Sequence, residues 1–333
     1  MKKIIYICVL ILIYFSKLNS QSITKTGTTS AKFLNIPIGA RAIGMGGAFV
    51  STADDISAMY WNPAGITNIN NMQGMISHNK WLADIYFNYI GLAKPINENN
   101  FIGLNISSMT MGEFERTTLD EPDGTGDYFK ANSFSIGVTY SSKLTEWFSI
   151  GTNVKFIHEG IWNSSANGFA IDIGTLFVTP FEGVKFGAGI SNFGEKLKII
   201  GDDLLTQKDI SPNNGNNPNI NSNLSTDNFE LPLNLQIGIS YEPINNESEK
   251  LIFEIDAAHP NDNLEYLNFG TEYSFYNKML AVRGGIRSIG QKEAEKQYTF
   301  GFGINYEDFK FDFSQINYNR LKNIQSIGLI YLF

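Results

Sequence analysis

The stretch Leu231-Pro-Leu-Asn-Leu-Gln-Ile-Gly-Ile-Ser-Tyr241 alternates between large apolar residues and small or polar ones. Leucine, isoleucine and tyrosine fill every odd position, and asparagine, glutamine, glycine and serine fill the even positions from Asn234 onward. Successive side chains of a β-strand point to opposite sides of its sheet. The alternation therefore indicates a strand with one apolar and one polar face.

The same two-faced pattern recurs along the chain, at residues 148–156, 184–191, 297–306 and 309–313. Across these repeats the second face is mainly Gly, Ser, Asn and Thr with a few charges, and in 309–313 it is Lys310 and Asp312. A soluble sheet packs its apolar face into a core and carries many charges on the other face. Small polar residues suit the interior of a membrane barrel whose apolar face contacts outer-membrane lipid.

The composition favours the same class of protein. Of 333 residues only 17% are charged, whereas 13% are aromatic and 31 are glycine, a skew away from soluble domains. The formal net charge is -8 and no basic stripe is present, so no nucleic-acid partner is expected.

The N-terminus has the pattern of a secretory signal peptide. Met1-Lys-Lys precedes an apolar run, Ile4 to Phe15, and a polar segment that ends at Ser20. We expect residues 1–20 to be removed; the alternative, an uncleaved anchor, requires a longer run to span a bilayer. Because the single cysteine, Cys8, lies in this segment, thiol chemistry is excluded from the processed chain.

Residues 21–71 lack the alternation and are predicted to form a hatch inside the barrel. The run from Ala31 to Val50 is rich in glycine and other small residues, which suits close backbone packing. Residues from Asp54 to Trp61 could form a short helix capped by Asp54 or Asp55, and Asn62-Pro63 would end it.

Residues 72–333 are predicted to form the barrel itself, an all-β structure of fourteen antiparallel transmembrane strands. The expected strands begin near Met72, Asp84, Asn100, Ala131, Glu146, Asn167, Gly183, Leu231, Lys250, Leu264, Lys278, Gln297, Asp308 and Asn323.

The connections provide an independent check on this count. The even-numbered connections are mostly tight, and the odd-numbered ones include all the long segments, namely 109–130, 159–166, 193–230 and 288–296. Outer-membrane barrels have short periplasmic turns and long external loops. This parity predicts an integral outer-membrane protein with a periplasmic N-terminus and extracellular long loops.

Nothing in the sequence predicts catalysis, a metal site or a cofactor. The glycines between Gly39 and Gly47 match no phosphate-binding motif, and the three histidines lack metal-ligand spacing. The charged residues on inward faces are expected to form a salt-bridge network in the lumen: Lys155, Asp172, Lys185, Glu254, Asp256, Arg283 and Arg287.

Two of the external loops carry residues of the types that anchor protein interfaces. These candidate partner-binding residues are Phe114, Arg116, Tyr128, Phe129 and Trp162. The alternative is that they belong to the aromatic belt at the membrane boundary.

Two neighbouring stretches, Ala40-Arg-Ala-Ile-Gly-Met-Gly-Gly-Ala-Phe-Val50 and Ala53-Asp-Asp-Ile-Ser-Ala-Met-Tyr-Trp-Asn-Pro-Ala-Gly65, resemble the PorV/PorQ family. That family is a Bacteroidetes branch of the FadL-like outer-membrane barrels. Within the second stretch, Asn62, Pro63 and Ala64 resemble the hatch motif of FadL-like proteins. The apolar last strand, which ends in Phe333, resembles the signal recognised by the barrel insertion machinery.

The resemblance implies a non-enzymatic accessory role in type IX secretion. Such a protein would bind the C-terminal domain of secreted cargo, the large translocon barrel, or both, through its extracellular loops. Two alternatives stay open: a FadL-type channel for hydrophobic small molecules, and a mainly structural barrel that stabilises a surface complex.

Overall fold

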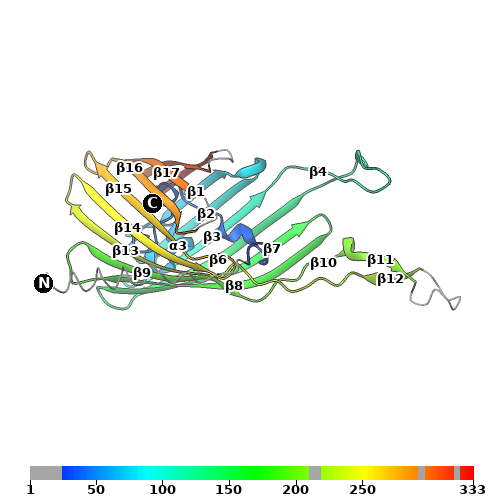
Figure 1. Ribbon diagram of the computed structural model, residues 1–333. Helices are drawn as coiled ribbons and strands as arrows, with labels where there is room; N and C mark the ends of the chain where they lie inside the picture. The colour runs from blue at the N-terminus through cyan, green and yellow to red at the C-terminus, as the bar shows by residue number, and fades with distance from the viewer. Residues whose placement is uncertain (1–24, 210–218, 292–296, 319–322) are drawn as a thin grey trace.

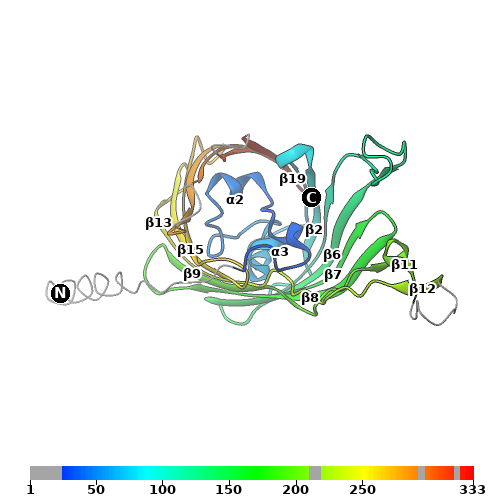
Figure 2. The same cartoon turned by 45° about the vertical axis from the view of Figure 1, so that its right-hand side comes forward.

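The computed structural model describes residues 25–209, 219–291, 297–318 and 323–333. Fourteen long antiparallel strands form a closed barrel, which confirms the predicted fold class (Figures 1 and 2). They are β1 (Gln73–Lys80), β2 (Tyr86–Pro95), β3 (Asn100–Thr110), β6 (Ala131–Lys143), β7 (Phe148–Ile161), β8 (Ser164–Val178), β9 (Val184–Gly194), β13 (Asn234–Asn245), β14 (Lys250–Pro260), β15 (Tyr266–Phe275), β16 (Leu280–Ile289), β17 (Gln297–Tyr306), β18 (Phe309–Asn317) and β19 (Ile324–Leu332).

The barrel closes where β1 pairs with β19. The wall is also continuous between β8 and β9, with a register irregularity between Ile171 and Ile173. Each strand begins within three residues of its predicted position. The predicted faces are confirmed as well: Ile237 is 54% exposed on the outer wall, whereas Ser240 of the same strand is 1% exposed and faces the lumen.

Two details of the strand prediction are wrong. The first concerns Leu231, which was expected to start a lipid-facing strand but is buried in the hydrophobic core, and β13 begins only at Asn234. The second concerns residues 159–166, expected to be a long connection. Strands β7 and β8 extend through them and leave only Trp162 and Asn163 as the turn, with Trp162 at a φ of 50°.

Two long connections project from one end of the barrel, the long-loop end (Figure 1). The connection after β3 forms the hairpin β4 (Phe114–Glu115) with β5 (Tyr128–Phe129). The connection after β9 contains β10 (Ile200–Gly201), η4 (Asp202–Leu204), β11 (Leu205–Lys208) and β12 (Ile220–Asn223). The even-numbered connections, such as the two-residue turn between β17 and β18, lie at the other, short-turn end, as their parity predicts. The β7–β8 turn is equally short but lies at the long-loop end.

An inner segment, residues 31–69, lies inside the barrel (Figure 2). It contains η1 (Lys32–Asn35), α2 (Ala40–Gly44), α3 (Ala58–Trp61) and η2 (Pro63–Asn68). Helix α2 packs against β16 to β19, and η2 packs against β3 and β6 to β8, so the segment reaches opposite walls.

The predicted short helix is present but starts later than Asp54, at Ala58. Asp55 is placed ahead of it, and its carboxylate accepts a hydrogen bond from the Ser57 amide at 2.8 Å. The signal-peptide prediction concerns residues outside the described part of the chain. No described helix combines the length and hydrophobicity that a membrane span requires.

Candidate functional site

A groove with a volume of about 610 Å³ lies at the long-loop end. It forms where hairpin β4–β5, the β7–β8 turn and the connection after β9 meet, and Figure 1 shows these segments reaching beyond the rest of the wall. Four of the five candidate loop residues line it: Phe114, Arg116, Phe129 and Trp162. The structure therefore gathers residues from two loops into one site, which we call the aromatic groove.

Ring contacts connect the two loops across the aromatic groove. Phe114 is in register with Phe129 in the β4–β5 hairpin, and their ring centroids are 5.7 Å apart. The Phe129 ring lies 6.3 Å from that of Trp162 on the β7–β8 turn. The Arg116 guanidinium lies 5.2 Å from the centre of the Trp162 ring, a cation–π arrangement. These contacts hold large side chains in place although the site is open to solvent.

Tyr128, the fifth candidate, does not line the groove. It is in register with Glu115, one position away from the Phe114–Phe129 pair. Because side chains alternate along a strand, Tyr128 projects from the opposite face of the hairpin, where it is 59% exposed.

The groove also contains residues that sequence reasoning missed. Asp203 of η4 accepts hydrogen bonds from the Asn163 amide and from the Ser164 hydroxyl, both at 2.9 Å, and so joins the connection after β9 to the β7–β8 turn. The remaining apolar lining comes from Ile161, Ile199 and Leu204. The apolar residues Ile199 and Leu204, in a loop rich in Asn, Asp and Ser, were the available signal.

The three candidate hatch residues connect the inner segment to the wall of the barrel. The Asn62 side-chain amide donates to the Val50 carbonyl at 2.8 Å and to the Thr175 carbonyl of β8 at 3.0 Å. Its oxygen accepts from the Ala64 amide at 3.2 Å, and the Pro63 carbonyl accepts from the Ser141 hydroxyl at 2.6 Å. Asn62 thus donates hydrogen bonds to backbone carbonyls of both the inner segment and the wall.

Glycine makes this close approach possible. Adding a Cβ to Gly174 of β8 would place it 2.0 Å from the Asn62 side-chain oxygen. At Gly151 of β7 the added atom would lie 2.4 Å from the Pro63 carbonyl carbon. A side chain at either position would push Asn62 or Pro63 away from the wall.

A buried ion-pair network holds the other side of the inner segment. Arg41 of α2 forms ion pairs with Asp54, with Asp55 at 3.1 Å and with Glu272 of β15 at 2.8 Å. Glu272 also pairs with Arg283, whose guanidinium contacts Asp312 of β18 at 2.6 Å. The network therefore joins the inner segment to three wall strands.

The predicted lumen network is confirmed for part of its members. Lys155 pairs with Asp172 at 2.9 Å, and Lys185 pairs with Glu242 at 2.7 Å. Arg287 forms no ion pair with any residue in the described ranges.

Glu254 and Asp256 of β14 do not take part in that network either. The Asp256 carboxylate accepts from the Phe49 amide at 2.8 Å and from the Val50 amide at 3.1 Å. Glu254 accepts from the Ser51 amide at 2.6 Å. These carboxylates accept hydrogen bonds from backbone N–H groups of the inner segment instead of pairing with cations.

The closed barrel, its apolar outer wall and the inner segment within its lumen define an integral outer-membrane β-barrel. The sequence matches the family described as type IX secretion system protein PorV over residues 19–259. Because this match covers well over half of the chain, the protein belongs to the PorV family. No curated protein sequence matches the chain.

Solved FadL-like barrels share the fold. The CymD monoaromatic hydrocarbon channel superposes with a TM-score of 0.60 at 12% identity, covering 90% of this chain and 98% of that one. The toluene transporter TodX of P. putida gives 0.59 at 11% identity, covering 89% and 98%. A FadL homologue of Pseudomonas aeruginosa gives 0.56 at 13% identity, covering 90% and 99%.

Proposed function

We propose that this protein uses the aromatic groove to bind the C-terminal domain of secreted cargo, the type IX translocon barrel, or both. In this proposal the long-loop end is extracellular and the N-terminus is periplasmic, following the parity of the connections. The observation that carries the proposal is the gathering of Phe114, Arg116, Phe129 and Trp162 around one solvent-open groove. Exposed Trp, Tyr and Arg side chains of this kind dominate the binding energy of protein interfaces.

The orientation of the groove argues against the alternative of an aromatic belt. Along β7, Ile161 shares a face with Ile157, which is fully buried on the lumen side. Val154 and Phe156 occupy the other, lipid-facing side. Because Ile161 lines the groove, the groove opens on the lumen side of the extended wall, where lipid does not reach.

The inner segment supports a binding role over transport through the lumen. The Asn62 contacts fix it to β8, and the Arg41 network fixes it to β15, so it acts as a hatch in this proposal. A cavity beside it, of about 70 Å³, is lined mainly by polar side chains that include Lys155 and Arg287. A channel for hydrophobic molecules requires an apolar path instead.

The FadL-type channel remains the second candidate because the similar solved barrels include proteins titled as toluene and hydrocarbon transporters. At 11–12% identity these likenesses show the fold alone. A structural role in a surface complex differs from the main proposal only in that no cargo touches the groove.

The test is affinity capture from the native outer membrane with a tagged Trp162→Ala variant. Phe181→Ala is the matched control, because Phe181 is an exposed aromatic residue on a short turn at the opposite end. We expect Trp162→Ala to lose most of the captured cargo or translocon and Phe181→Ala to retain it. Equal capture by both variants would refute the assignment of the groove.

A further inference from the structure

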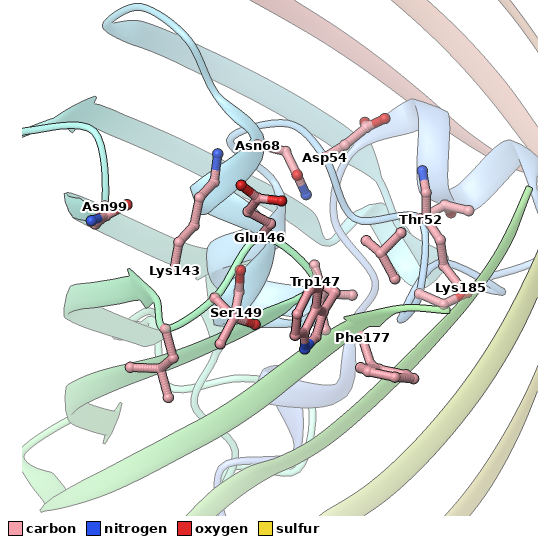
Figure 3. A pocket seen from close by; sticks show the side chains of 15 residues that line it. Thr52, Asp54, Asn68, Asn99, Lys143, Glu146, Trp147, Ser149, Phe177 and Lys185 are labelled. Atoms are coloured by element: carbon pink, nitrogen blue, oxygen red, sulfur yellow. The ribbon is translucent and has the colours of Figure 1, made fainter. Parts of the chain in front are cut away.

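The short-turn end of the lumen contains an open vestibule that the proposed function does not use. Two cavities form it, one of about 520 Å³ and one of about 330 Å³. They share Asp54, Asn68 and Lys185 as lining residues, so they adjoin. Figure 3 shows the larger one, with side chains of the inner segment facing those of the β6–β7 turn and of β9 across it.

Lysines concentrate around this vestibule. Seven cationic and five acidic side chains line the two cavities, although the whole chain carries 25 basic and 33 acidic residues. The lysines come from wall strands all around the mouth or from the turns between them: Lys143, Lys185, Lys250, Lys278 and Lys310. The local charge therefore has the opposite sign to that of the chain.

Two of these lysines are neutralised by carboxylates of the protein. Lys185 pairs with Glu242 at 2.7 Å. Lys250 lies 3.6 Å from Asp54 and 3.7 Å from Glu242, which it shares with Lys185. The buried acids of the vestibule are likewise occupied, because Arg41 and Arg283 pair with them.

The other three lysines have no carboxylate partner within the described part of the chain. The Lys143 ammonium lies 5.4 Å from the centre of the Phe101 ring. Lys278 donates to the Asn245 side-chain oxygen at 3.1 Å. Lys310 forms no ion pair with a described residue, although its charge is close enough to contribute to the lowered pKa of Asp54. Lys143 lines the larger cavity, whereas Lys278 and Lys310 line the smaller one. The unpaired positive charges thus lie in both parts of one elongated vestibule.

We propose that the vestibule binds an extended acidic peptide segment of a protein on that side of the membrane. An extended chain can place one carboxylate beside the cations of each cavity. A single compact anion cannot reach both groups of cations. Side chains with amide and hydroxyl groups, such as Asn68, Asn99 and Ser149, can bond a peptide backbone. Trp147 and Phe177 offer an apolar surface for an interleaved aromatic or aliphatic residue.

The test is fluorescence anisotropy of the purified full-length barrel in detergent, with a rhodamine-labelled octapeptide containing four glutamates and two phenylalanines. We expect salt-sensitive binding, because exposed charges are screened over about 10 Å at 0.1 M salt. The double variant Lys143→Gln/Lys310→Gln should bind the peptide about tenfold more weakly. The matched control is Lys80→Gln/Lys198→Gln, which removes the same charge from residues outside the vestibule.

Several outcomes would overturn the proposal. These are an absence of binding to the wild type, an equal loss in both double variants, and binding that does not depend on salt. Tripolyphosphate serves as a competitor: if it displaces the peptide at far lower concentration than an unlabelled copy of the peptide does, the site belongs to a phosphorylated anion and the peptide assignment fails. Circular dichroism confirms that each variant is folded.

Cargo capture through Trp162 is measured separately and concerns the opposite end of the barrel. The peptide proposal and the cargo proposal can therefore fail independently of each other.

Discussion

The Arg116 guanidinium lies over the Trp162 ring at 5.2 Å, which connects hairpin β4–β5 to the β7–β8 turn. An exposed cation–π contact of this kind is worth about 0.5–1 kcal/mol. The pair also presents a cation and an indole side by side at the mouth of the aromatic groove.

Changing Arg116 to Ala should weaken partner capture less than the loss of Trp162 does. The expected decrease is about two- to fivefold, because the losses are the cation–π contact, one exposed charge and an exposed ion pair with Asp127, which contributes little. Arg116→Lys should retain part of the affinity, since an ammonium can occupy the same place over the ring. Quantitative mass spectrometry of captured proteins measures both effects, and an unchanged yield from Arg116→Ala would exclude this pair from the interface.

Changing Gly174 to Ala should displace Asn62 and loosen the inner segment without preventing barrel insertion. The added Cβ would overlap the Asn62 oxygen, which is 2.0 Å from its position. Gly112→Ala is the matched control, because nothing lies within 4 Å of the added atom there. Limited proteolysis of reconstituted protein should cut the inner segment faster only in Gly174→Ala. Identical cleavage of the two variants would mean that the contact between Asn62 and β8 does not hold the inner segment.

Removing the Asn62 side chain should have a related but milder effect. In Asn62→Ala the Val50 and Thr175 carbonyls lose their donor, and each unsatisfied buried group costs about 1–3 kcal/mol. We expect higher permeability of the barrel to small polar solutes in a liposome swelling assay. Asn167→Ala, a change at an exposed asparagine on the outer face of β8, should leave permeability unchanged.

Replacing Arg41 by Gln should free the inner segment more strongly than either of these changes. Breaking a buried ion pair by removing one partner costs about 3–5 kcal/mol, because the remaining charge stays buried. Here Glu272 and Asp55 would each lose a cationic partner. A thermal scan should show a lower midpoint for Arg41→Gln, and an unchanged midpoint would mean that the network does not stabilise the fold.

Acidification should weaken the ion pair between Arg41 and Asp54 and so loosen the inner segment. Burial raises the pKa of Asp54, but Arg41 and Lys250 outweigh burial and hold the pKa well below its usual range. A carboxylate with a lowered folded-state pKa stabilises the fold fully above its unfolded pKa, and this contribution is lost as the pH falls below about 4. Proteolysis of the inner segment by an acid protease should therefore accelerate below that pH. Asp54→Asn should already be cleaved faster at neutral pH and should change less on acidification.

The sequence predicted the barrel well because period-two alternation reports directly on a wall with lipid outside and small polar residues inside. It failed at Leu231, because a buried leucine and a lipid-facing leucine look the same in an alternating pattern. It also failed at residues 159–166, where glycine, serine and asparagine indicate a loop although β7 and β8 continue through them.

The aromatic groove was predictable only in part. Residue type identified Phe114, Arg116, Phe129 and Trp162, but their contacts join loops far apart in the chain. Of the vestibule lysines the sequence singled out only Lys185, as a member of the lumen network, because the grouping of the others depends on the closure of the barrel. Strand parity alone would place the lysines on strands inward, without showing which of them a carboxylate neutralises, and it says nothing of Lys278 in the β15–β16 turn.

The most direct test of the central claim is site-specific photo-crosslinking in the native outer membrane. A benzophenone amino acid is placed at Trp162 and, in a parallel strain, at Phe181 on the opposite end. The proposal predicts crosslinks from position 162 to the C-terminal domain of secreted cargo or to the translocon barrel, and none of these from position 181. Crosslinks from position 162 to lipid alone, or the same protein crosslinks from both positions, would contradict it.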